Sequence, residues 1–245
     1  MHAFLDTDIF VYRIGFTTQE EDFGIARWRM DDLIERTLDS VKATSYQCYL
    51  TASKDETAFR KKVYPEYKMN RKAPRPIHYE ALREYLLTNW NAKLVSCIEA
   101  DDAIGIDATA YDGDCVIVSI DKDLKQIPGR HYNFVKNEFC DITKEQGLRF
   151  FYTQMLTGDT ADNIKGIAGI GPKKAEAIIS RGTNEQEWFN IVREEYGNDY
   201  EMYINATALW ILTKPYPEGS WKQHPLGSLL LEESSTGLLE ESEVS

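Results

Sequence analysis

The sequence predicts an α/β fold with a mostly parallel central sheet flanked by helices, followed by a smaller helical region. Two observations carry this prediction. Short runs rich in Val, Ile and Leu alternate with helix-like segments as far as about Val135, which is the pattern of a parallel sheet. From about Thr143 onward only helical patterns remain, around a glycine-rich segment. A chain of 245 residues can hold one main domain and a small second one.

Five strands are expected in the first region. The first strand ends near Asp6, and the others are expected at residues 46–50, 93–98, 115–120 and 131–135. Residues 115–120 are almost continuously apolar, as expected when both faces of a strand are covered. Apolar periodicity predicts helices at 25–43, 77–90 and 101–111 and a short one at 122–127. In the second region we expect a helix starting at Pro172 and others at 188–196 and 202–212.

These elements predict three parts. Residues 1–150 form the α/β domain with a basic segment at about 60–80, residues 151–215 form the helical region, and residues 216–245 form an acidic tail. The tail repeats Leu-Leu-Glu-Glu-Ser at 230–234 and 238–242. Its acidic composition predicts disorder, and the leucine pairs make it a candidate for binding a protein partner.

Composition excludes several classes of protein. No apolar run reaches the roughly 18 residues of a membrane span, and the N-terminus has no basic region of a signal peptide, so we expect a cytoplasmic protein. The four cysteines lack C-x-x-C spacing, so no zinc site is expected. The net charge of −12 taken alone argues against nucleic-acid binding. However, the last 20 residues contribute −5 of it.

Acidic residues form four clusters along the chain. They are Asp6 with Asp8; Glu99 with Asp101 and Asp102; Asp121 with Asp123; and Asp159 with Asp162. The first three follow predicted strands, whose carboxyl ends meet at one edge of a parallel sheet. Carboxylates gathered there repel one another unless cations lie among them, and oxygen ligands suit Mg²⁺ or Mn²⁺. Two such ions about 4 Å apart can catalyse phosphodiester hydrolysis.

Residues 156–179 combine two kinds of chemistry. Asp159 and Asp162 are three residues apart, so we expect both on one face of a helical turn. Three glycines, Gly166, Gly169 and Gly171, then lead to Pro172, Lys173 and Lys174. Proline suits the first position of a helix, and a helix N-terminus beside lysines can bind phosphate. The segment therefore predicts a metal-dependent enzyme that acts on nucleic acid.

Residues 60–75 are strongly basic. Seven bases face one acid, Glu66, which gives a local charge of 7 − 1 = +6. The bases are Arg60, Lys61, Lys62, Lys68, Arg71, Lys72 and Arg75. Tyr64 and Tyr67 lie between them, and bases for phosphates with aromatic rings for stacking indicate a single-strand binding surface.

Four motifs together resemble the flap endonuclease and 5′-nuclease superfamily. Residues 158–171 resemble its Gly-Asp-x-x-Asp-Asn-Ile-x-Gly helix–three-turn–helix segment, and residues 98–102 resemble its [IV]-E-A-D-D element. Residues 119–123 resemble its S-x-D-x-D element, and residues 65–71, P-E-Y-K-x-N-R, resemble its active-site arch. The resemblance covers roughly residues 3–180 and implies a domain of the PIN-like type followed by a duplex-binding hairpin.

The resemblance also implies site residues. It implies metal ligation, by two Mg²⁺ ions with Mn²⁺ as a substitute, at Asp6, Glu99, Asp101, Asp102, Asp121, Asp123, Asp159 and Asp162. Asp55 is the candidate for the family's second-strand aspartate; the alternative is a site that differs there. Lys68 and Arg71 match the arch cations that contact the scissile phosphate. With the basic segment and the hairpin, DNA binding is expected at Arg60, Lys61, Tyr67, Lys72, Gly166, Gly169, Gly171, Lys173 and Lys174. Hairpin carbonyls are expected to hold K⁺.

We therefore expect a Mg²⁺-dependent 5′-nuclease that acts as a 5′→3′ exonuclease, a flap endonuclease or both. Its expected partner is DNA with a 5′ end, flap or overhang, or an RNA primer in a hybrid, in replication, primer removal or repair. Pro74 and Pro76 follow Arg71 closely, so the arch should be short, as in the phage branch, whose location would be the host cytoplasm. Two alternatives remain open: a non-catalytic branched-DNA-binding protein, and a haloacid-dehalogenase-type phosphatase with Asp6 as nucleophile.

Overall fold

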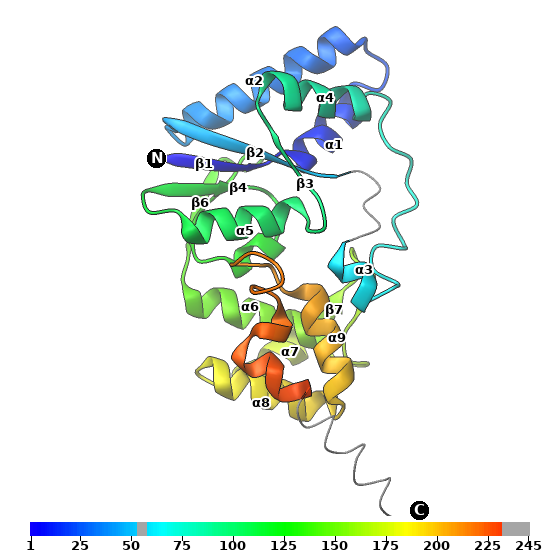
Figure 1. Ribbon diagram of the computed structural model, residues 1–245, viewed down its shortest axis with the longest axis vertical. Helices are drawn as coiled ribbons and strands as arrows, with labels where there is room; N and C mark the ends of the chain where they lie inside the picture. The colour runs from blue at the N-terminus through cyan, green and yellow to red at the C-terminus, as the bar shows by residue number, and fades with distance from the viewer. Residues whose placement is uncertain (53–57, 232–245) are drawn as a thin grey trace, which may run out of the picture. The chain divides into compact units, whose positions relative to one another are not determined.

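The computed structural model describes residues 1–52 and 58–231, which form two compact units (Figure 1). The first unit is built from Met1–Ala58 and Lys72–Ile142, and the second from Phe59–Arg71 and the chain from Thr143 onward. The division thus falls at residue 142 where the sequence analysis expected 150, because α6 (Lys144–Thr157) packs with the helices that follow it. The basic residues 59–71 belong to the second unit.

The first unit contains a six-stranded sheet in the order β3-β2-β1-β4-β5-β6. Its strands are β1 (His2–Asp6), β2 (Ser45–Thr51), β3 (Lys93–Val95), β4 (Cys115–Val118), β5 (Gly129–Asn133) and β6 (Glu138–Ile142). All pairs are parallel except β5 with β6, so the predicted fold class is confirmed. β6 was not predicted, because it is an exposed edge strand with no apolar alternation.

Helices cover both faces of this sheet (Figure 1). They are α1 (Thr7–Thr17), α2 (Phe23–Ser40), α4 (Tyr79–Asn89) and α5 (Ala100–Ala110), with a short 3₁₀ helix η1 (Asp123–Gln126). One core joins α1, α2 and α4 to the sheet face that carries Leu5, Leu50 and Val118. The opposite face lies against α5. Coverage on both faces explains the continuous apolar character of β4.

The second unit is mainly helical. Its elements are α3 (Phe59–Val63), α6, β7 (Gly158–Asp159), β8 (Ile164–Lys165), α7 (Pro172–Ile179), α8 (Glu185–Tyr196), α9 (Asp199–Leu209) and the 3₁₀ helix η2 (Trp221–Gln223). Local sequence sets the helix ends. Thr143 and Gln146 form a capping box at the start of α6, and Asn184 and Asn198 cap α8 and α9. Gly197 ends α8 in the left-handed conformation.

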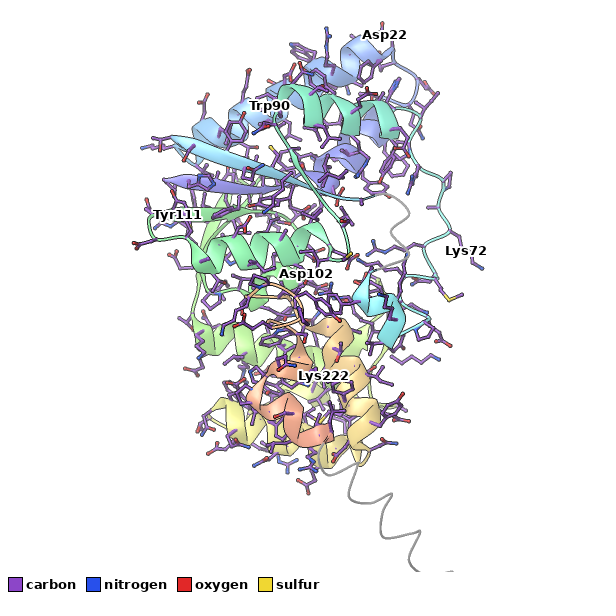
Figure 2. All side chains as sticks on the ribbon, in the orientation of Figure 1. Asp22, Lys72, Trp90, Asp102, Tyr111 and Lys222 are labelled. Carbon is purple, nitrogen blue, oxygen red and sulfur yellow. The ribbon has the colours of Figure 1, made fainter. Side chains whose placement is uncertain are left out.

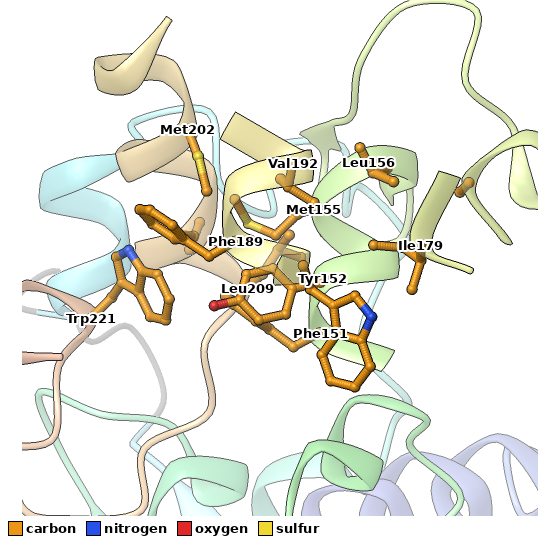
Figure 3. Close-up of a cluster of buried hydrophobic side chains, with 14 of the residues drawn as sticks. Phe151, Tyr152, Met155, Leu156, Ile179, Phe189, Val192, Met202, Leu209 and Trp221 are labelled. Atoms are coloured by element: carbon orange, nitrogen blue, oxygen red, sulfur yellow. The ribbon is translucent and has the colours of Figure 1, made fainter. Parts of the chain in front are cut away.

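The core of the second unit gathers aromatic side chains from α6, α8 and η2 (Figure 3). It includes Trp221, which is fully buried, together with Leu226 and Leu230. The sequence analysis expected disorder from residue 216, and this is wrong for residues 216–231. Leu226 and Leu230 are four residues apart in a helical segment, so both point into the core. Residues 232–245 lie outside the described residues.

None of the helices in the two described stretches has the length and apolar character to cross a bilayer.

The buried position of Trp221 predicts a large stability effect. Trp221→Ala should lower the free energy of unfolding by about 3–5 kcal/mol, because it leaves a cavity in an aromatic core. Trp28→Ala is the matched control, since Trp28 is 63% exposed. Urea unfolding followed by circular dichroism measures both variants. Equal unfolding midpoints for the two variants would contradict the assignment of residues 216–231 to the core.

Candidate functional site

The carboxyl ends of the parallel strands bring three acidic segments to one edge of the first unit. Asp6 is the last residue of β1 and directly precedes α1. Glu99 precedes α5 on the chain that follows β3, and Asp121 follows β4. This convergence is the one that the strand order predicts, because β1 lies between β2 and β4.

Hydrogen bonds tie Asp6 to the segment after β4. The Ser119 hydroxyl donates to Asp6 Oδ2 at 2.8 Å, and the backbone N–H of Asp121 donates to Ser119 Oγ at 2.9 Å. The N–H of Asp123 in turn donates to Asp121 Oδ1 at 2.9 Å. Asp6 is 5% exposed, whereas Asp121 is exposed to solvent. Asp6 is thus a buried carboxyl group held by a hydrogen bond, and Asp121 is the solvent-exposed member of the same network.

The surroundings of Asp6 oppose its negative charge. Burial raises the pKa of Asp6 from 3.8 to about 7, the negative charges of Asp8 and Asp121 add to the rise, and the hydrogen bond from Ser119 opposes it. A cation that replaced the proton of Asp6 would compensate the negative charge of its carboxylate. This environment favours the binding of a cation at Asp6.

The acids at the start of α5 are partly committed to capping that helix. The backbone N–H of Glu99 donates to Asp102 Oδ2 at 3.1 Å, and the N–H of Asp102 donates to Asp101 Oδ1 at 2.7 Å. Asp102 is fully buried and lies at the first turn of α5 (Figure 2). Glu99 and Asp101 are half-buried, so they are better placed than Asp102 to meet an ion.

The donor set suits a hard cation, although a complete coordination shell is not preformed. Within residues 1–52 and 58–231, no three His, Cys, Asp or Glu side chains are grouped closely enough to hold a metal ion. The residues that do converge offer oxygen atoms alone, which is the chemistry of Mg²⁺ and Mn²⁺. The predicted ligand set therefore stays a prediction, and Asp55 lies outside the described residues.

Asp159 and Asp162 belong to the second unit and differ from expectation. They do not share a helical turn: Asp159 ends the short strand β7, and Asp162 lies in the turn before β8. The carboxylate of Asp159 accepts from the N–H of Ala161 at 2.8 Å. Gly158 has a φ of +70° and ends α6, so a turn follows it in place of the expected helical turn.

Lys68 and Arg71 both contact Asp162. Lys68 Nζ lies 3.6 Å from Asp162 Oδ2, and Arg71 forms a hydrogen-bonded ion pair with Asp162 Oδ1. The hydroxyl of Tyr67 donates to Asp162 Oδ2 at 3.0 Å. Asn70 adds a hydrogen bond to the carbonyl of Thr160 at 2.7 Å. The two predicted phosphate-binding cations thus hold residues 67–71 against the turn that carries Asp162.

Two predicted DNA-binding residues have a different role. Arg60 is 2% exposed, and its guanidinium donates to the carbonyls of Ala208 and Trp210 at 3.0 and 2.7 Å, which caps the end of α9. Tyr67 is 4% exposed and packs in the core. For these two the prediction is wrong, because a buried side chain cannot reach a DNA strand. Lys61 and Lys72 are exposed, and Lys72 points away from the chain (Figure 2).

The glycine segment has a structural part and an exposed part. A Cβ on Gly166 would lie 2.3 Å from the backbone nitrogen of Gly158, so Gly166 permits close packing of the two strands of the β7–β8 pair. Gly169, with a φ of +78°, and Gly171 are exposed. Lys173 and Lys174 lie exposed in the first turn of α7, which carries Pro172 at its start. This exposed part keeps the expected phosphate-binding chemistry, and K⁺ binding stays a prediction.

Two exposed aromatic residues were missed by the sequence analysis. Tyr12 and Phe16 of α1 are 40% and 48% exposed, and their stacked rings are 6.1 Å apart. Their spacing of four residues, on the face opposite the buried Phe10 and Ile14, was the available signal. Exposed rings on the helix that starts beside Asp6 can stack on nucleobases.

Comparison with known families decides the relationship. Residues 2–154 match the family described as 5′-3′ exonuclease, N-terminal resolvase-like domain. The chain belongs to this family. Similar members are the flap endonuclease Xni of Shewanella baltica, 35% identical over 140 residues, and that of Shewanella putrefaciens, 34% identical. Each alignment covers 51% of this chain and 53% of the relative, so the chain spans about half the length of these curated relatives.

Solved structures of this exonuclease type share the fold. The T5 D15 protein, co-crystallised with metal ions, superposes with a TM-score of 0.62 at 18% identity and covers 98% of both chains. The T5 5′-exonuclease with bound zinc gives 0.61 at 18% identity, over 98% of this chain and 99% of that one. The superposition shows a common fold, and at 18% identity the likeness shows the fold alone.

The raised pKa of Asp6 predicts a pH-dependent stability. Between about pH 4 and pH 7 the folded protein holds a proton on Asp6 that the unfolded chain has lost, so stability falls as pH rises and then levels off. Asp6→Asn should therefore raise the melting temperature by about 5 °C at pH 8 and leave it unchanged near pH 4. Thermal melts across this range test it, with the exposed Asp112→Asn as control. A gain of equal size at both pH values would contradict this account.

Proposed function

We propose that this chain is a divalent-metal-dependent 5′-nuclease that hydrolyses phosphodiester bonds near the 5′ ends of DNA. The observation that carries the proposal is the buried carboxyl group of Asp6 at the strand edge, beside acids from other segments, in a member of the 5′-3′ exonuclease family. The names of its relatives, flap endonuclease and 5′-exonuclease, agree with this reaction.

The roles of the acidic residues follow from their positions. Asp6 and Asp121 would hold the ion with Glu99 and Asp101, and Mg²⁺ is the proposed ion with Mn²⁺ as its substitute. When bound, such ions supply an activated water and neutralise charge on the phosphate. Ser119 keeps Asp6 oriented through its 2.8 Å hydrogen bond, so the carboxyl group needs no rearrangement during the reaction.

Each unit has exposed features that would bind DNA. In the second unit, Lys173 and Lys174 at the start of α7 suit the phosphates of a duplex. In the first unit, the stacked rings of Tyr12 and Phe16 suit an unpaired base. Lys68 and Arg71 would bind phosphate in competition with Asp162, which holds them in the absence of DNA. We retain their proposed role in stabilising transition-state charge.

The contacts of Asp8 weigh against the phosphatase alternative. In that alternative Asp6 and Asp8 form the D-x-D motif, with Asp6 as the nucleophile. Here Asp8 accepts from Arg83 Nη1 at 2.8 Å and from the backbone N–H of Thr51 at 2.8 Å. The family match over residues 2–154 also favours the nuclease.

The test is cleavage of a duplex with a labelled 5′ flap and of a blunt duplex, each with Mg²⁺ and with EDTA. Mg²⁺-dependent release of a flap-length product would establish a flap endonuclease, and short products from both substrates would establish a 5′→3′ exonuclease. Asp121→Ala should lower the rate at least about 100-fold while sparing the fold, because Asp121 is exposed. Asp112→Ala is the matched control and should cleave normally. DNA binding without any cleavage would contradict the proposal and favour a branched-DNA-binding protein.

A further inference from the structure

Arg83 of α4 is a buried arginine at the same edge of the sheet. It is 5% exposed, and its guanidinium lies 5.4 Å from the centre of the Tyr79 ring. One terminal nitrogen donates to Asp8 Oδ1 at 2.8 Å, and the other donates to the backbone carbonyl of Thr51. The planar guanidinium therefore connects the first turn of α1 to the last residue of β2.

Asp8 completes a closed set of contacts. Its second oxygen, Oδ2, accepts from the backbone N–H of Thr51 at 2.8 Å. Thr51 thus offers its N–H to Asp8 and its carbonyl to Arg83, while Asp8 and Arg83 pair with each other. Both carboxylate oxygens of Asp8 are engaged by this arrangement.

The same contacts extend to the start of α5. The hydroxyl oxygen of Thr51 accepts from the N–H of Ala100 at 2.9 Å, directly after Glu99. We propose that Arg83 is a positioning residue: by clamping Asp8 to Thr51, it fixes the chain segments that carry Asp6 and Glu99. This inference rests on the proposed nuclease function, in which those acids hold the ion.

The positive charge of Arg83 has a second consequence. It compensates Asp8 from inside the protein, so one of the acids at this edge does not draw a cation. Arg83 is too deeply buried to bind a DNA phosphate. Its charge and its geometry can be separated, since Arg83→Lys keeps the charge but loses the planar fork and Arg83→Met loses both.

Metal binding without DNA tests the charge. Isothermal titration with Mn²⁺ should give a dissociation constant about fivefold lower for Arg83→Met than for the native chain, because one positive charge near the acids is gone. Arg83→Lys should bind Mn²⁺ as the native chain does. Arg36→Met is the control, because Arg36 is exposed and pairs with Asp32 on α2. Unchanged or weaker Mn²⁺ binding by folded Arg83→Met would overturn the charge assignment.

Steady-state cleavage tests the geometry. Both Arg83 variants should lose about tenfold or more in kcat with KM for DNA unchanged, since a displaced carboxylate impairs catalysis without loosening the DNA. In a protein that already carries Asp8→Asn, adding Arg83→Met should lower kcat by less than about threefold, because the partner of Arg83 is already gone. A raised KM, or an equal loss in both backgrounds, would overturn the positioning role.

The two readouts keep this inference separate from the proposed function. If the native chain cleaves no DNA, the nuclease proposal fails, while the Mn²⁺ titration still tests the Arg83 charge. If Arg83→Met does not fold, Arg83→Lys carries the test, because it keeps a positive charge beside Asp8. Native kcat in Arg83→Lys, with its fold intact, would show that the clamp does not position the acids.

Discussion

Repulsion between carboxylates at one sheet edge is the constraint on which the first unit depends. Parallel strands bring Asp6, Asp8 and Asp121 together, and burial, with the charges of Asp8 and Asp121 in addition, raises the pKa of Asp6 to about 7. Donors fixed by the fold hold the acids in place: Ser119 contacts Asp6, and Arg83 contacts Asp8. Arg83 thereby compensates the charge of Asp8 from within the protein, and under the proposed function an external cation would compensate Asp6. The sheet sets the positions of the carboxyl groups, and the hydrogen bonds set the partner of each one.

The second unit neutralises its acids differently. Asp162 accepts contacts from Tyr67, Lys68 and Arg71, all from the basic segment. The segment that would contact DNA phosphates is therefore already ordered by contacts with a carboxylate, which is negatively charged as a phosphate is. Under the proposed function, DNA binding at Lys68 and Arg71 would be an exchange of anions and therefore sensitive to salt. The contacts with Asp162 hold both cations in place without DNA.

Sequence patterns predicted the fold class because strand runs such as 115–120 and the capping signals of α6 are local. They placed Asp6, Glu99 and Asp121 at strand ends for the same reason. They could not show that Arg60 caps α9, since that contact joins residues about 150 positions apart. Nor could they reveal that Tyr67 is buried or that Arg83 pairs with Asp8, because burial and partner choice depend on tertiary packing. Acidic composition also concealed the buried Leu230.

The central claim is that the carboxyl edge around Asp6 binds a divalent ion. Crystals soaked with Mn²⁺ and measured at a wavelength where manganese scatters anomalously test this claim most directly. The expected result is an anomalous peak within about 2.3 Å of Asp6 and of an acid from another segment, with Asp8 still paired to Arg83. The absence of a peak at Asp6 in crystals that bind Mn²⁺ elsewhere would contradict the account.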